Sequence, residues 1–318
     1  MSSIEYLSKI FPSNRIKIQD DLTSYLQATT GKSVKIHAAV IPEKTSEISE
    51  LVKGALQNKL KLYPISSGKN WGYSDSMPIT DDNIIVDLSH MDKIINYDPE
   101  LGFITIEPGV TQKQLAKFLK INGDKHIVAV TGSSPSTSII GNYLERGFGI
   151  SSYMDHASAV TDLEAVLPDG HIYKSQLALL GCDKINNLYK HGIGPQTDGL
   201  FFQSGIGIVT KMTIKLATKP ETSTIFFIES DQQGLTSVIK SLREFREAWP
   251  VSNLTFKIFD QLYVLAASGM PYPEEYLYKN AALPKELINQ LAQDTKTPKY
   301  TITVTLSGPK PLIHCISK

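Results

Sequence analysis

The chain has 318 residues, 41% of them hydrophobic, and its 32 lysines and arginines balance 32 aspartates and glutamates. At roughly 150 residues per domain, this length predicts two domains. The balanced charge argues against a nucleic-acid partner, and the absence of any run of about 18 apolar residues argues against a membrane span. With two cysteines and no secretory pattern at its start, the sequence predicts a cytoplasmic protein without a disulfide framework.

The first part of the chain alternates predicted strands and helices. A helical lead-in near 21–27 precedes a strand over 34–42 and a helix over 43–60. In that helix, Ile48, Leu51, Val52 and Leu56 recur at helical spacing. A short apolar strand over 62–66 then leads directly into a glycine-containing loop, which predicts a mixed α and β opening.

Further strands are predicted over 83–91 and 102–110, before a helix that begins with a capping box between Thr111 and Gln114. The segment 127–155 is rich in Gly, Ser and Thr yet patterned, which is typical of a functional loop. A hairpin is predicted around Pro168-Asp169-Gly170, and a glycine-rich turn then feeds a strand that closes at Pro220.

The residue pattern of the sequence changes near 219–222, where we expect a domain boundary. A strand over 224–230 and an amphipathic helix over 234–249 predict a ferredoxin-like layer of α+β class. The last segment, 301–318, begins as a strand and shows neither a cap nor a returning element. We therefore expect one domain over 1–220 and a second, partial one over 221–318.

Three motifs in the first domain could carry chemistry. The first, PISSGKNWGY, runs from Pro64 to Tyr73 and places two hydroxyls, a glycine and a lysine after a strand. Consecutive backbone N–H groups in such a turn suit phosphate oxygens, although the sequence is neither a Walker A loop nor GxGxxG. An ordinary strand-to-loop turn is the alternative.

The second motif, Gly132–Asn142, offers hydroxyls and backbone donors that suit a long polar cofactor, unless it is only a flexible surface loop. The apolar pair Ile139-Ile140 argues against flexibility. The third motif, Asp198–Thr210, begins a strand between glycines and could lie under a flat ring; a buried hairpin is the alternative.

The order, spacing and flanks of these motifs resemble the vanillyl-alcohol oxidase / p-cresol methylhydroxylase family of flavoproteins. SSGKNWGY resembles the pyrophosphate loop of that family, IIGNYLERGFGISSYMDH its second flavin-binding segment, and GIGPQTDGLFFQSGIGIVTKMTIKL its third. The resemblance covers about 34–220 strongly and 221–290 weakly. It implies an FAD-binding domain of two α+β subdomains, followed by a cap that covers the flavin ring.

The resemblance also assigns roles to residues. Tyr73 matches the first phenolate-binding tyrosine, and Asp155 matches the acidic residue near flavin N5, where it could accept a proton or tune the flavin. The alternative for Asp155 is a loop carboxylate that caps backbone N–H groups. His156 beside it could shape the local charge, although a lone histidine is more often structural. The residues implied to bind FAD are Pro64, Ser66, Ser67, Gly68, Lys69, Asn70, Trp71, Gly132, Ser133, Ser136, Ile140, Gly141, Asn142, Gly207, Ile208 and Val209.

Parts of the family pattern are missing. The second tyrosine and the arginine of the phenolate cluster lie far downstream in the family, whereas this chain stops at Lys318 inside the expected cap. The pyrophosphate loop has Asn70 and Trp71 and lacks the histidine that a related branch uses for covalent flavin attachment. We therefore expect a fragment, a truncated product or a degenerate homologue.

Three functions remain open. The first is an FAD-dependent oxidoreductase that moves a hydride from an alcohol or para-substituted phenol to flavin N5, with oxygen or an electron-transfer protein as acceptor. The second is a flavin-binding remnant without catalysis. The third is an NADPH-dependent reductase of the cell-wall precursor pathway, which the GKNWGY and MDH segments fit poorly. No metal is expected, and a second copy of the chain is a candidate partner.

Overall fold

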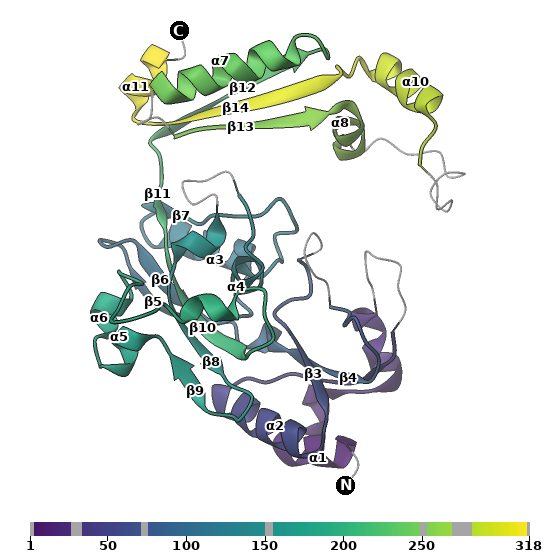
Figure 1. The fold of residues 1–318 in the computed structure, drawn as a ribbon, viewed down its shortest axis with the longest axis vertical. Coiled ribbons are helices and arrows are strands. Elements are labelled where there is room, and N and C mark those ends of the chain that lie inside the picture. Colours follow the sequence, from purple (N-terminus) through teal and green to yellow (C-terminus); the bar gives the residue numbers. More distant parts are fainter. Residues whose placement is uncertain are drawn as a thin grey trace. The chain divides into compact units, whose positions relative to one another are not determined.

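The computed structural model describes residues 3–26, 34–70, 76–149, 155–248, 253–268 and 282–316. Contacts along the chain divide it into two compact units, Met1–Lys219 and Pro220–Lys318. Each unit combines helices with sheets, which is the predicted α+β class (Figure 1). None of the helices in the described ranges is long and apolar enough to cross a membrane.

The first unit contains a small sheet whose strands run mainly parallel. Its strands are β1 (Ile16–Lys17), β2 (Ile36–Val40), β3 (Lys61–Ile65) and β4 (Asn83–Asp87). The order is β1-β2-β4-β3, and both β2 and β3 run parallel to the buried β4 between them. Because parallel strands end at the same edge of a sheet, the loops that follow β3 and β4 emerge together.

A second, antiparallel sheet supplies much of the core of the first unit. Its strands are β5 (Ile94–Asp98), β6 (Phe103–Ile106), β8 (Val160–Val166), β9 (Ile172–Lys174) and β10 (Ile208–Lys215). The order is β5-β6-β10-β8-β9, so β8 and β9 form the predicted hairpin. A further ladder pairs β7 (His126–Ile127) with β11 (Ala217–Thr218).

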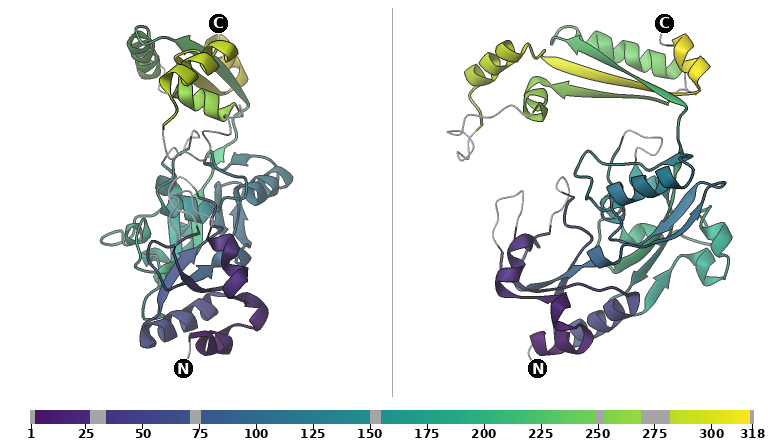
Figure 2. Two further views of the ribbon diagram at one scale, coloured as in Figure 1. Left: turned by 90° about the vertical axis from the view of Figure 1, so that its right-hand side faces the viewer. Right: turned by 180° about the vertical axis from the view of Figure 1, so that it is seen from behind.

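Helices cover these sheets. They are α1 (Ser3–Ile10), α2 (Thr45–Gln57), α3 (Gln112–Ile121), α4 (Ile139–Leu144), α5 (Gln176–Leu179) and α6 (Asp183–Asn186). Near the helical lead-in predicted at 21–27, the chain forms a 3₁₀ helix over Gln19–Tyr25. Figure 2 shows α1 beside α2, where a Cβ on Gly54 would lie 2.0 Å from the Tyr6 ring. The glycine therefore permits the close packing of the two helices.

The start of α3 corrects one detail of the sequence prediction. The Thr111 hydroxyl accepts a hydrogen bond from the Gln114 N–H at 3.2 Å, as predicted. The second bond of the box, from the Thr111 N–H to the Gln114 side-chain oxygen, is not found among the described residues, so only half of the capping box forms. The Gln114 Nε2 donates to the carbonyl oxygen of Asp92 at 2.8 Å.

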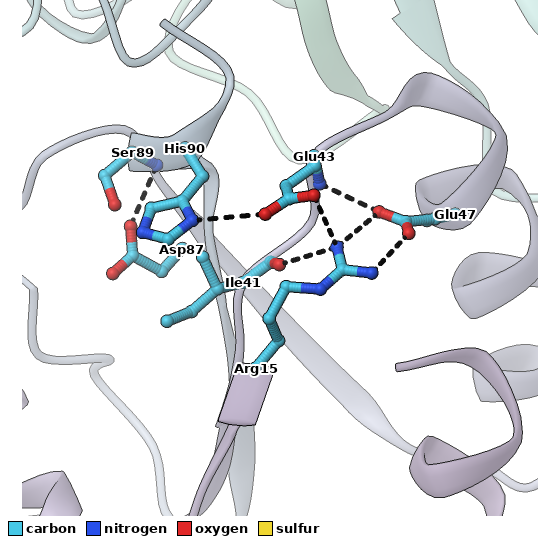
Figure 3. Close-up of polar contacts among 7 residues, drawn as sticks. All are labelled: Arg15, Ile41, Glu43, Glu47, Asp87, Ser89 and His90. Atoms are coloured by element: carbon cyan, nitrogen blue, oxygen red, sulfur yellow. Dashed lines mark hydrogen bonds and ion pairs between the residues drawn. The ribbon is translucent and has the colours of Figure 1, made fainter. Parts of the chain in front are cut away.

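A charged cluster ties the N-terminal segment to the start of α2 (Figure 3). Arg15 donates to both carboxylate oxygens of Glu47, at 2.9 and 2.7 Å, and the backbone N–H of Glu43 donates to the same carboxylate at 2.8 Å. Burial raises the pKa of Glu47, but hydrogen bonds from Arg15 and from backbone N–H groups outweigh burial and leave it below its ordinary value. The carboxylate is therefore charged at neutral pH.

The second unit contains a three-stranded antiparallel sheet and, in its described ranges, four helices. Its strands are β12 (Thr222–Ser230), β13 (Asn253–Asp260) and β14 (Tyr300–Gly308), in the order β12-β14-β13. Its helices are α7 (Leu235–Ala248), α8 (Gln261–Ala267), α10 (Lys285–Thr295) and α11 (Lys310–Ile316). Side chains of α7 and α11 pack on Ile302, Val304 and Leu306, which fits both ribbon views (Figures 1 and 2).

The expectation that the chain ends without a further element was wrong, since α11 follows β14 directly. Pro311 lies in the first turn of this helix, where a missing N–H costs no intrahelical hydrogen bond. Ile313 is buried against the sheet, and Ile316 packs on the same core. This apolar pair at a spacing of three residues was the signal that the sequence offered.

Candidate functional site

A cleft in the first unit brings together parts of all three predicted motifs. The loop after β3, the turn into α4 and the segment that enters β10 form its walls. The described residues that line it are Pro64, Ile65, Ser66, Ser67, Gly68, Lys69, Asn70, Leu88, Ser138, Ile140, Gly141, Leu144, Glu145, Phe201, Gln203, Ser204, Gly207, Ile208 and Val209. It lies outside the carboxyl ends of parallel strands, where open α/β sheets commonly bind ligands.

The first wall is the loop that follows Ile65 at the end of β3. Gly68 has a φ of +62°, in the left-handed region that favours glycine, and a Cβ there would lie 2.8 Å from the Cβ of Ser76. The carbonyl oxygen of Lys69 accepts hydrogen bonds from the hydroxyls of Ser133 and Thr137, at 3.0 and 3.1 Å. The second motif thus holds this loop through its backbone.

The second wall is the first turn of α4. Ser138 caps this helix, because its hydroxyl accepts from the Gly141 N–H at 3.0 Å. The N–H of Ser138 donates to the Ser67 hydroxyl at 3.1 Å, and a Cβ on Gly141 would lie 3.1 Å from the Ser66 Oγ. The two walls therefore approach each other closely, and the helix N-terminus is anchored to the first loop.

The third wall is the segment from the 3₁₀ helix Asp198–Phe201 into β10. The buried Asp198 carboxylate accepts hydrogen bonds from the hydroxyls of Tyr173 and Ser175, at 2.6 and 2.9 Å. Burial raises the pKa of Asp198, although these two hydrogen bonds oppose the rise. Further along, the Gln203 N–H donates to the carbonyl of Leu144 at 2.9 Å, which fastens this wall to α4.

The cleft contains most of the residues expected to bind a cofactor. Those that line it are Pro64, Ser66, Ser67, Gly68, Lys69, Asn70, Ile140, Gly141, Gly207, Ile208 and Val209. Four others do not line it: Gly132 and Ser136 are exposed, Ser133 supports the Lys69 carbonyl, and Asn142 lies behind Asn70.

Asp155, the one expected catalytic residue that the structure describes, is not part of this lining. Tyr73, like the expected cofactor residue Trp71, lies outside the described residues. Asp155 is exposed, and its carboxylate accepts a hydrogen bond from the Ala157 N–H at 3.2 Å, which caps the 3₁₀ helix His156–Ala159. This capping is the alternative that the sequence left open for Asp155.

Residues 36–176 match a protein family described as an FAD binding domain. Over 266 residues the chain is 33% identical to a 1'-carboxy-chondrochloren decarboxylase of Chondromyces crocatus, and over 272 residues it is 29% identical to a 4-cresol dehydrogenase [hydroxylating] flavoprotein subunit of Pseudomonas putida. The matches cover 83% and 85% of this chain but 49% and 52% of the relatives, so the chain spans about half their length.

Solved structures give the same relationship. A structure of p-cresol methylhydroxylase with substrate bound superimposes with a TM-score of 0.89 at 25% identity, over 98% of this chain and 61% of that one. A 4-ethylphenol oxidase from Gulosibacter chungangensis gives a TM-score of 0.86 at 23% identity, over 98% of this chain and 60% of the other. The chain belongs to the FAD-binding flavoproteins of the p-cresol methylhydroxylase type. The resemblance seen in the sequence and the expected cofactor, FAD, are thereby confirmed.

In this flavoprotein the cleft fits FAD by three local features. Gly68, Gly141 and Gly207 each stand where a Cβ would crowd a neighbouring residue, at 2.8, 3.1 and 2.8 Å, so the segments that line the cleft pack more closely than larger residues would allow. The Asn70 side-chain Nδ2 is buried without a hydrogen-bond partner among the described residues. An apolar groove that shares Pro64, Gly207 and Ile208 with the cleft offers room for a flat ring.

Several residues of the cleft were not named as candidate site residues from the sequence, although all but Leu88 lie within the predicted motif segments. They are Ile65, Leu88, Ser138, Leu144, Glu145, Phe201, Gln203 and Ser204. Ser138 had a visible signal, since a serine before an apolar helical turn is a preferred N-cap. Glu145 had none; burial beside the cleft raises the pKa of its carboxyl. Glu145 and Lys69 are the charged members of the described lining.

Proposed function

We propose that this chain is the FAD-binding part of an oxidoreductase that removes a hydride from an alcohol or a para-substituted phenol. The observation that carries the proposal is the convergence of three separate segments on one cleft lined by several serines and glycines. When bound, FAD supplies a two-electron acceptor at flavin N5. Oxygen or an electron-transfer protein then reoxidises it.

The residues of the chain divide the work of holding the cofactor. The loop Ser66–Asn70 holds the pyrophosphate, through backbone N–H groups and the positive charge of Lys69. Ile140 and Gly141 form the opposite wall, and Gly207–Val209 lie along a flat ring of the cofactor. The neighbouring apolar groove, which includes Leu62, Val166 and Ile206, suits the adenine ring.

Asp155 and Tyr73 carry the expected chemistry on the substrate. Asp155 accepts a proton or stabilises charge near the reacting carbon, and Tyr73 holds a phenolate oxygen. The exposed position of the Asp155 carboxylate leaves it free to contact a substrate while it caps the helix that follows. Asp155→Ala is expected to slow flavin reduction by about 10²–10⁴-fold if it acts as an acid or base.

The test begins with the visible absorption spectrum of the purified chain with added FAD. A bound flavin whose absorbance bleaches under anaerobic conditions with a para-alkylphenol or an aliphatic alcohol supports the proposal. A bound flavin that none of these substrates bleaches supports the alternative, a flavin-binding remnant without catalysis. A folded chain that takes up no FAD contradicts both functions.

The 33% identity to a protein named as a decarboxylase favours one second candidate. In that case the substrate carries a carboxylate that leaves as carbon dioxide during oxidation. Matched phenols with and without this carboxylate separate the two functions. Release of carbon dioxide together with flavin bleaching supports the second candidate, whereas bleaching by the uncarboxylated phenol alone supports the first.

A further inference from the structure

A chain of buried hydrogen bonds leads from His156 to the wall of the cleft. The His156 ring is fully buried, and its Nδ1 lies 2.6 Å from the Oδ1 of Asn142. The Nδ2 of Asn142 donates in turn to the Oδ1 of Asn70 at 3.1 Å. Asn70 lines the cleft, whereas Asn142 and His156 lie behind it.

The two end atoms of this series of hydrogen bonds lack partners among the described residues. Neither the His156 Nε2 nor the Asn70 Nδ2 has a hydrogen-bond partner among the described residues, although both atoms are buried. Buried polar groups are nearly always satisfied, and an exception indicates strain, a function or a missing ligand. At the Asn70 end, the unsatisfied atom belongs to a residue that lines the cleft.

Two glycines make room for the hydrogen-bonded side chains of Asn142 and His156. A Cβ on Gly147 would lie 2.0 Å from the Asn142 Oδ1, and a Cβ on Gly149 would lie 2.5 Å from the His156 Nε2. The backbone of the same segment accepts a hydrogen bond from the His156 N–H, at the carbonyl of Gly147 and 3.0 Å. The polar chain is therefore packed tightly, and its side chains have little freedom to leave their positions.

The hydrogen bonds between His156, Asn142 and Asn70 can be donated in either of two directions. If the His156 Nδ1 carries the proton, it donates to Asn142, Asn142 donates to Asn70, and Asn70 has a free N–H for the cleft. If the Nε2 carries the proton, both amides turn over and Asn70 offers an oxygen instead. The second direction leaves a buried N–H on the ring without an acceptor, and orphaned buried N–H groups are rarer than unfilled acceptors.

The ligand of the cleft also favours the first direction. The pyrophosphate of FAD is an anion and accepts hydrogen bonds, so a free amide N–H attracts it and an amide oxygen repels it. Burial lowers the pKa of His156 to about 4, against the opposing effect of Asp155, so the ring is neutral and has a single ring N–H to give at pH 7.

We propose that His156 is a positioning residue that, through Asn142, fixes the Asn70 amide as a hydrogen-bond donor toward the cofactor. This inference rests on the proposed binding of FAD in the cleft. It assigns His156 no contact with substrate or cofactor. The effect of His156 on FAD affinity must therefore act through Asn70.

A double-mutant cycle on FAD affinity tests this dependence. The dissociation constant of FAD, measured by quenching of its fluorescence, should rise about tenfold in Asn70→Ala, which loses one hydrogen bond to a charged group. His156→Leu should also raise it about tenfold in the otherwise unchanged chain, but less than about twofold when Asn70 is already alanine. Equal effects in both backgrounds would overturn the proposal, because a purely structural role does not depend on Asn70.

A second variant covers the case in which His156→Leu does not fold. Asn142→Asp is nearly isosteric and offers only acceptors, so the Asn70 amide must turn its N–H groups away from the cleft. FAD affinity should again fall about tenfold with Asn70 present and change less than about twofold in Asn70→Ala. Additive losses would contradict the proposed coupling.

Two further measurements keep this test separate from the test of function. If the unchanged chain binds no FAD, the proposed function fails and the inference fails with it; if it binds FAD without coupling to His156, only the inference fails. His126→Leu is the matched control, since His126 is another buried histidine, bonded to Tyr97 at 3.0 Å and absent from the lining of the cleft. It should lower the free energy of unfolding but leave FAD affinity within about twofold.

Discussion

Two buried polar networks support the cleft, and they differ in whether they are closed. In the network of the third wall, the Asp198 carboxylate receives hydroxyl donors from Tyr173 and Ser175, and the Tyr173 hydroxyl also meets Thr197 at 2.7 Å. The network of the second wall passes through Asn142 and ends in Asn70 and His156 atoms that have no hydrogen-bond partner among the described residues. Within this part of the structure, the first network is satisfied and the second is open at both ends.

This difference suggests that the Asp198 network stabilises a wall of the cleft, whereas the Asn142 network contributes to ligand binding. A fully satisfied buried network rigidifies the segment that it holds, here the entry into β10. A hydrogen-bond series with an unpaired end holds a polar group at a fixed position, and this group can bind a ligand without reorganisation. Acid, substitution and added bulk should therefore affect the two networks differently.

Acid should act on the two networks in opposite directions. The pKa of His156 falls from its ordinary 6.5 to about 4 in the folded chain, so between these values the unfolded chain binds a proton that the folded chain does not. Stability then falls as the pH is lowered through this window, by about 3 kcal/mol in total. The raised pKa of Asp198 has the opposite sign, because the folded chain holds its proton at higher pH and gains stability as the pH falls.

Urea unfolding at several pH values between 7 and 4 measures this effect. His156→Gln removes the titrating ring but keeps an N–H donor for Asn142, so its unfolding free energy should depend less steeply on pH than that of the unchanged chain. Identical pH profiles for the two proteins would show that His156 is not the group that titrates.

Removal of the Asp198 carboxylate should destabilise the closed network. Asp198→Ala leaves the Tyr173 and Ser175 hydroxyls without their acceptor and should lower the free energy of unfolding by about 2 kcal/mol. Asp198→Asn keeps one acceptor oxygen and removes the cost of a buried charge, so it should cost less than about 1 kcal/mol. Thermal or urea unfolding of both variants decides the matter; equal losses would mean that the charge itself is required.

A methyl group added at a glycine should destabilise the Asn142 network more than the Asp198 network. Gly147→Ala forces the Asn142 side chain aside and should cost about 1–2 kcal/mol of stability, together with FAD affinity. Gly199 is the matched control, since it lies in the 3₁₀ helix of the closed network and a Cβ there meets nothing within 4 Å. If Gly199→Ala costs as much as Gly147→Ala, the packing around the open chain is not special.

Sequence patterns were sufficient wherever a feature is local. The helical spacing of Ile48, Leu51 and Val52 gave α2, and the turn at Pro168-Asp169-Gly170 gave the hairpin of β8 and β9. The strand β3 and its loop were found for the same reason. Their residues are contiguous, so that period and turn chemistry carry the information.

Features that depend on the arrangement of elements were not visible in the sequence. Leu88 and Glu145 reach the cleft only because of where β4 and α4 end in the folded unit. His156 was noted in the sequence only as the neighbour of Asp155, and nothing pointed to its partner Asn142, which lies 14 positions away. Local patterns do not report the direction of a hydrogen-bond chain between such residues, since tertiary packing determines it.

The charged cluster around Arg15 and Glu47 allows the effects on these two networks to be compared with the loss of an ion pair away from the cleft. Arg15→Met should lower the free energy of unfolding by about 1 kcal/mol, because it removes two hydrogen bonds to Glu47 from side chains that are only 13% and 17% exposed. Lys35→Met is the control: its pair with Asp82 is 78% and 66% exposed, and its loss should cost less than about 0.5 kcal/mol. FAD affinity should stay unchanged in both variants, since none of these four residues lines the cleft. An Arg15 variant that loses FAD affinity would instead mean that the N-terminal segment helps to position the cleft. Residues away from the cleft walls would then also affect ligand binding.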